Sequence, residues 1–114
     1  MAQPPPPNDA IAELAQGLGE EDARELVRMF LNGFELTLAA LSSKDREDRR
    51  RAAHSLKSSS RIVGLLALSR QMAELEDRLA KDEGEVVPAD VSAARQKFDE
   101  IAPVLRAFAG VPGS

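Results

Sequence analysis

The sequence EEDARELVRMFLNGFELTLAAL, residues 20–41, decides the fold class. Its apolar side chains recur at intervals of three and four residues, which is the spacing of one face of an α-helix. Three acidic residues, Glu20, Glu21 and Asp22, open the stretch and suit the positive end of a helix dipole. The stretch therefore predicts a long helix with one buried face. The apolar positions are Ala23, Leu26, Val27, Phe30, Phe34, Leu38 and Leu41.

A short helix is expected before this stretch, and another helix follows it. Asn8 or Asp9 can cap the short helix, because both side chains accept hydrogen bonds from backbone N–H groups. Residues 42–44 form a short break after the long helix. Asp45 is then a suitable N-cap for a helix that reaches about Val63.

Two further helices complete the pattern. Gly64 marks a corner, and a stripe of leucine and methionine follows it to about Lys81. Pro88 suits the first position of a last helix. Pro103 should kink that helix or end it early, because proline lacks an N–H and crowds the preceding turn. The pattern predicts an all-α fold, an antiparallel up-and-down four-helix bundle with a short extra N-terminal helix.

The 114 residues are enough for one domain with a single core. Residues 1–8 contain four consecutive prolines and are expected to form a disordered leader. The helical bundle then occupies residues 9–109, and residues 110–114 form a flexible tail.

Composition excludes several classes of protein. The formal net charge of −4 argues against a general nucleic-acid binder, which carries a net basic face. The chain has no cysteine for disulfides or cysteine-based zinc sites. No run approaches the ~20 apolar residues of a membrane span, and the N-terminus lacks the pattern of a secretory signal. We therefore expect a cytoplasmic monomer that binds neither nucleic acid nor membrane.

The only histidine of the chain, His54, is the strongest candidate for chemistry. At about 100° per residue, polar neighbours fall within about 60° of it around the helix axis, whereas Leu56 points to the opposite side. These neighbours include Arg50, Arg51, Lys57, Ser58 and Arg61. An exposed imidazole among cations suits a nucleophile that receives a phosphoryl group. No glycine-rich nucleotide loop and no His/Cys metal cluster is present, which excludes an ATP-dependent kinase and leaves no metal site.

The run AHSLKSSS at residues 53–60, with Gly64 ten residues past His54, resembles the motif of the histidine-containing phosphotransfer (HPt) domain. That motif reads His-x-Leu-Lys-Gly and continues with small residues and a glycine. Leu56 and Gly64 match its structural positions, and the resemblance covers about residues 9–109. Ser58 stands where many members have glycine, and its small side chain should still leave room for a partner.

The resemblance implies a relay of phosphate. The receiver domain of a hybrid histidine kinase would pass a phosphoryl group from its aspartate to His54 Nε2, and the receiver of a downstream response regulator would then take it. Lys57 would stabilise the phosphate. The protein would need no cofactor of its own, because the receiver brings Mg²⁺. Partner contacts are expected at Arg50, Arg51, Ser58, Arg61, Gly33 and Phe34.

Other interpretations remain open from the residues alone. The same bundle can dock on a receiver or kinase without carrying phosphate. A hydrolase could use His54 as a base oriented by Glu47 or Asp48, near the start of the helix. The arginines can be a solvated face. Gly33 either makes room for a partner or allows close packing of helices.

Overall fold

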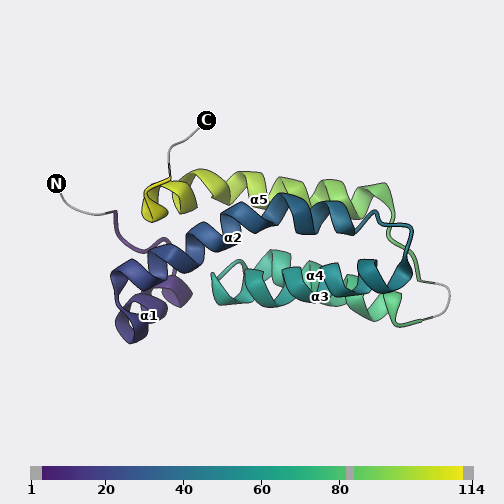
Figure 1. The fold of residues 1–114 in the computed structure, drawn as a ribbon, viewed down its shortest axis with the longest axis horizontal. Helices are drawn as coiled ribbons and strands as arrows, with labels where there is room; N and C mark the ends of the chain where they lie inside the picture. The colour runs from purple at the N-terminus through teal and green to yellow at the C-terminus, as the bar shows by residue number, and fades with distance from the viewer. Residues whose placement is uncertain (1–3, 82–83, 112–114) are drawn as a thin grey trace.

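The computed structural model describes residues 4–81 and 84–111, and all of its regular structure is helical, as predicted. Figure 1 shows α2, α3, α4 and α5 running in alternating directions along the long axis of the molecule, with α1 at the end where α2 begins. The fold is therefore the expected helical bundle with an extra N-terminal helix. The helices are α1 (Asp9–Leu18), α2 (Glu20–Ala40), α3 (Arg46–Ile62), α4 (Leu66–Leu79) and α5 (Pro88–Ala109).

Aromatic side chains from α2 and α5 fill the centre of the bundle. The rings of Phe34 and Phe98 stack with centroids 3.8 Å apart, and Phe30 lies 6.0 Å from each of them. All three are buried, and α3 contributes Leu56, which is 1% exposed. Each such side chain stabilises the fold by about 1.5–3 kcal/mol. No helix of residues 4–81 and 84–111 has the length and apolar character to cross a membrane.

Asn8 belongs to the fold, so the leader predicted for residues 1–8 extends one residue too far. Its side-chain oxygen accepts a hydrogen bond from the Ile11 N–H at 2.9 Å, which caps α1. Its amide also donates to the Val63 carbonyl at 2.9 Å. One side chain therefore caps the first helix and ties it to the end of α3. Residues 1–3 lie outside the described residues.

Gly64→Ala should lower the free energy of unfolding by about 2 kcal/mol. Gly64 has φ +80°, and a Cβ there would lie 2.5 Å from Cγ of Asn8, so the added methyl group strains the backbone and displaces the cap. Urea unfolding measures the loss. Gly17→Ala is the matched control, because nothing lies within 4 Å of its Cβ position and alanine favours the helix by up to ~1 kcal/mol. Equal effects of the two substitutions would contradict this account of the corner.

The last helix continues through Pro103 to Ala109, so the prediction of an early end is wrong. Pro103 is exposed, and burial of the opposite face keeps the helix intact despite the missing N–H. Residues 110 and 111 are also no flexible tail. Gly110 has φ 75°, and the Val111 N–H donates to the Arg106 carbonyl at 2.9 Å, as in a Schellman cap. Residues 112–114 lie outside the described residues.

Two residues fix the start of α3. Asp45 is the predicted N-cap, and its carboxylate accepts from the Glu47 N–H at 2.9 Å. The Arg46 guanidinium donates to the carbonyl of Leu79 at 2.6 Å and also to the carbonyl of Lys81, so it holds α3 against the end of α4. These contacts set the height at which His54 faces α4.

Candidate functional site

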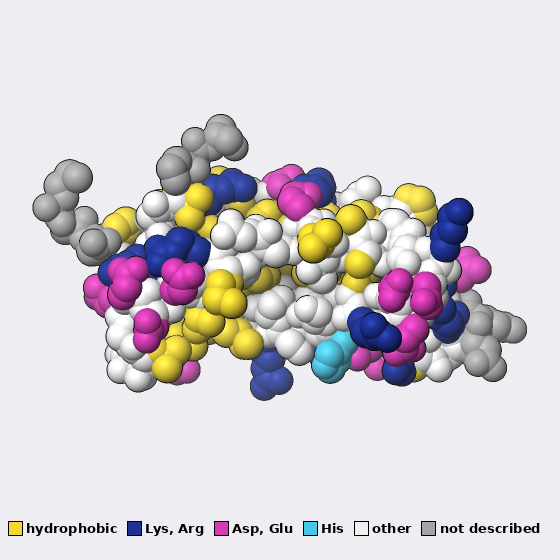
Figure 2. All heavy atoms as spheres, in the orientation of Figure 1, with side chains coloured by type: hydrophobic (Ala, Val, Ile, Leu, Met, Phe, Trp, Pro, Cys, Tyr) yellow, Lys and Arg dark blue, Asp and Glu magenta, His cyan; other side chains and the backbone are white. Residues whose placement is uncertain are grey.

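His54 lies in the middle of α3 with 62% of its side chain exposed. Its neighbours Ala53 and Leu56 are buried, and they hold this stretch of the helix against the core. Figure 2 shows the imidazole, the single cyan side chain, at the lower edge of the molecule and open to solvent. The prediction that His54 points away from the apolar face is therefore confirmed.

A carboxylate from α4 holds the imidazole. Glu76 Oε2 lies 2.8 Å from His54 Nδ1, and its other oxygen, Oε1, accepts from Lys57 Nζ at 2.5 Å. An ionised carboxylate only accepts hydrogen bonds, so Nδ1 carries the proton. In the neutral ring the lone pair is then on Nε2, which has no hydrogen-bond partner among residues 4–81 and 84–111. The contact therefore leaves Nε2 as the ring nitrogen with a free lone pair, open to solvent.

The same contacts keep Glu76 ionised. The hydrogen bond from Lys57 is the largest cause that holds the pKa of Glu76 below its usual value of 4.5. Partial burial acts in the opposite direction, and the hydrogen bond from His54 lowers the pKa further. A group whose pKa falls on folding stabilises the protein above its unfolded pKa and loses that effect as the pH drops. At neutral pH the triad of Glu76, His54 and Lys57 is therefore intact.

Glu76 was not predicted as a site residue from the sequence. Glu47 and Asp48 were the candidate partners of the imidazole, but Glu47 instead pairs with Arg50 at 3.3 Å and Arg51 at 3.9 Å. Glu76 follows the buried Leu75 at the edge of the apolar stripe of α4. Pairing α3 and α4 as antiparallel neighbours is the signal that would have placed this carboxylate opposite His54.

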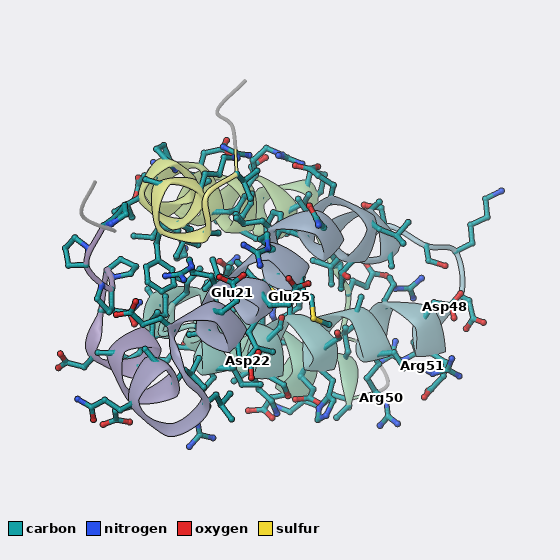
Figure 3. All side chains as sticks on the ribbon, turned by 60° about the vertical axis from the view of Figure 1, so that its left-hand side comes forward. Glu21, Asp22, Glu25, Asp48, Arg50 and Arg51 are labelled. Atoms are coloured by element: carbon teal, nitrogen blue, oxygen red, sulfur yellow. The ribbon has the colours of Figure 1, made fainter. Side chains whose placement is uncertain are left out.

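The predicted ring of cations is real but partly neutralised. Figure 3 shows Arg50 and Arg51 on the outer side of α3, next to Asp48. Both arginines share the carboxylate of Glu47, and Lys57 is engaged by Glu76. Arg61 has no carboxylate partner within the described part of the chain. The charge available to a phosphoryl group is thus smaller than the sequence implied.

Gly33 and Phe34 differ in their surroundings. Nothing lies within 4 Å of a Cβ placed on Gly33, which excludes close helix packing as the reason for this glycine. It lines an open hollow of about 160 Å³ between α2 and α3, opposite Ser55 and Ser59. Phe34 is only 1% exposed and stacks on Phe98, so its assignment to a partner surface is wrong and it is a core residue.

The remaining predicted residues lie where the sequence placed them. Ser58 is exposed, one turn from His54, and the imidazole bonds to Glu76 and not to this hydroxyl. Leu56 is buried and Gly64 forms the corner between α3 and α4. Within residues 4–81 and 84–111, no three His, Asp or Glu side chains are grouped as a metal site requires.

Comparison with known protein families identifies the family of this chain. The family model for the Hpt domain matches residues 8–103, which include α1 to α4, most of α5 and the whole His54 site. The chain belongs to the Hpt domain family. Hpt domains serve histidine phosphotransfer in phosphorelays and interact with receiver domains. Searches of curated proteins and of solved structures found no match to this Hpt domain.

Glu76→Gln should slow acceptance of phosphate by this Hpt domain about tenfold. A glutamine amide can donate or accept, so it no longer fixes the proton on His54 Nδ1, and it leaves Lys57 without a charged partner. Single-turnover transfer measures the rate. Glu74→Gln, an exposed carboxylate on the same helix, is the control and should transfer at the wild-type rate. Equal rates for both variants would show that Glu76 has no part in acceptance.

Proposed function

We propose that this Hpt domain relays a phosphoryl group between the aspartates of two receiver domains, and that His54 Nε2 carries it in between. The observation that supports this most strongly is the contact of Glu76 with His54 Nδ1, which leaves Nε2 as the free nucleophile on an exposed side chain. The family match supports phosphotransfer in general.

The step is a direct displacement at phosphorus. The Nε2 lone pair forms a bond to phosphorus while the bond from phosphorus to the aspartyl oxygen of the receiver breaks. The imidazole gains positive charge as this bond forms, and the Glu76 carboxylate 2.8 Å from Nδ1 compensates it. The proton stays on Nδ1 throughout. In the second step the bond from phosphorus to Nε2 breaks while an aspartyl oxygen of the second receiver forms the new bond, and each receiver would supply the Mg²⁺ for its own step.

A receiver would cover the side of the domain where α2 and α3 expose apolar and small residues. Met29 is 61% exposed and Leu36 is 80% exposed, and each lines a hollow between α2 and α3. Ser55, next to His54, lines both hollows. Exposed apolar side chains beside a reactive group favour a protein partner over a small substrate.

The structure does not favour hydrolysis. The Glu76–His54 pair is like the base and orienting acid of a hydrolase. However, no hydroxyl among the described residues makes a hydrogen bond with Nε2, so the pair has no side-chain nucleophile to activate. The remaining alternative, docking without phosphate, gives no reason for an exposed imidazole with a fixed tautomer.

Phosphotransfer from receivers tests the proposal. Receiver domains labelled at their aspartates are mixed with the protein and Mg²⁺, and we expect rapid transfer of label to His54 from at least one of them. ATP and Mg²⁺ without a receiver should give no label, because the sequence has no nucleotide loop. Docking of receivers without any transfer would support the phosphate-free interaction module instead.

Gly33→Gln should separate docking from stability. The helix gains up to ~1 kcal/mol because glutamine is a better helix former than glycine, and nothing in the protein obstructs its Cβ. Its long side chain covers the hollow opposite Ser55 and Ser59, so transfer should slow about tenfold. Gly33→Ala gains similar stability and should transfer at nearly the wild-type rate. If Gly33→Gln transfers as fast as Gly33→Ala, this hollow is not covered by the receiver.

A further inference from the structure

A further hollow lies between α3 and α4, beyond Lys57. It is open and has a volume of about 370 Å³. Its rim carries three cations, Lys57, Arg61 and Arg70, and no acidic residue lines it. The full lining is Lys57, Ser58, Arg61, Leu66, Ser69, Arg70 and Ala73. A positive hollow on a protein of net charge −4 is a local feature that requires an explanation.

Arg61 and Arg70 differ from most arginines of the described chain. Most of the others pair with a carboxylate or donate to a backbone carbonyl, as Arg78 does with Asp90 and Arg46 with the end of α4. Within residues 4–81 and 84–111, Arg61 and Arg70 have neither a carboxylate partner nor a backbone carbonyl partner. They come from different helices and line the same hollow. Two unpaired guanidinium groups at one site repel each other, so an anion between them would be favourable.

Two polar residues of the hollow, Ser69 and Lys57, already have hydrogen-bond partners within the protein. Ser69 is 8% exposed, and its hydroxyl donates to the Lys57 carbonyl at 2.9 Å. Lys57 directs its ammonium to Glu76, on the side of His54. Ser69 and Lys57 therefore need no ligand, and Arg61 and Arg70 are the charged groups of the lining without a partner in the described part of the chain.

The phosphoryl group itself does not fill this hollow. Arg61 follows His54 by seven residues, which is about 10 Å along the axis of α3. A phosphoryl group on Nε2 extends only a few ångströms from the ring. The anion that fits between Arg61 and Arg70 is thus a second group on the partner that covers His54.

We propose that Arg61 and Arg70 clamp an aspartate or glutamate side chain on the surface of the receiver, beside its active site. Arginine binds carboxylates through two parallel hydrogen bonds, which gives this contact both affinity and direction. The clamp anchors the receiver at one side of His54 and selects receivers that carry an acid at that place. This proposal rests on the proposed relay, because it assigns the hollow to the same partner.

Binding, measured separately from transfer, tests the clamp. Receivers held in the activated state with Mg²⁺ and beryllofluoride are titrated against the wild type, Arg70→Glu and Arg61→Glu. Either substitution should raise Kd about tenfold at low salt, and the difference should shrink as salt is added. The transfer rate of the saturated complex should stay near that of the wild type. Replacing the matching acid of the receiver with arginine should restore affinity for Arg70→Glu.

Arg106→Glu is the control, because it makes the same change of charge at a distant position. Arg106 belongs to α5, which lies on the other side of the bundle from α3 (Figure 1), so this substitution should leave Kd unchanged. Thermal unfolding verifies that each variant is folded. If both clamp variants bind like Arg106→Glu, or if no receiver binds, the clamp is overturned. If receivers bind with the predicted dependence but none phosphorylates His54, the clamp stands and the relay fails.

Discussion

His54→Gln is expected to abolish acceptance of phosphate from every receiver. Glutamine is polar and of similar length, but it has no nitrogen lone pair that can attack phosphorus. The side chain is 62% exposed, so the free energy of unfolding should change by no more than about 0.5 kcal/mol. Transfer of label from a phosphorylated receiver and urea unfolding measure the two quantities on the same preparation.

Two further measurements make this result specific. Binding of an activated receiver to His54→Gln should remain close to that of the wild type, because the hollows on both sides of α3 are unchanged. Lys57→Ala should slow transfer without stopping it, since the imidazole remains in place. Label on the His54→Gln protein would mean that another residue accepts phosphate, and the assignment of His54 would be wrong.

Phe34→Ala should cost about 3–5 kcal/mol of the free energy of unfolding. Phe34 is 1% exposed and stacks on Phe98 at 3.8 Å, with Phe30 at 6.0 Å, so its removal leaves a cavity between α2 and α5. The rest of the bundle cannot collapse around this space without moving whole helices. Denaturant unfolding measures the loss.

Leu36→Ala is the matched control on the same helix. Leu36 is 80% exposed, and its truncation should change stability by no more than about 0.5 kcal/mol. The same substitution removes apolar surface beside the proposed docking side, so it should weaken receiver binding. A small loss for Phe34→Ala together with a defect in binding would show that Phe34 belongs to the partner surface after all.

Helix periodicity was enough to predict most of this fold. The stripe from Ala23 to Leu41 is buried as expected except at Leu26, which is only partly buried. Asp45 caps one helix and Pro88 begins another where the sequence places them. Local rules were insufficient at the two ends of the chain. Asn8 was one of the two predicted caps of α1, but its second hydrogen bond joins it to a carbonyl 55 residues away, which no local rule predicts. The survival of α5 beyond Pro103 likewise depends on what its other face buries.

The candidate site was predicted in part, for the same reason. The position of His54 and Lys57 follows from one helix, and a helix has a known angular spacing. Glu76 comes from another helix, and only the packing of α3 on α4 brings it to the imidazole. Phe34 was misplaced because a helical stripe identifies which residues share a face and not which of them a neighbouring helix will cover.

The triad of Glu76, His54 and Lys57 is contained in a single helical hairpin, α3 and α4 with the corner at Gly64 between them. The hairpin is held at both ends, by Asn8 at the corner and by Arg46 at its open end. The alignment of α4 against α3 therefore decides whether Glu76 reaches the imidazole. One residue inserted within α4, between Leu66 and Glu76, would turn the carboxylate by about 100° around the helix axis relative to the first turn and carry it away from the ring. A site made of contacts this close in the chain closes short loops, so it can assemble early in folding, before α2 and α5 enclose the core.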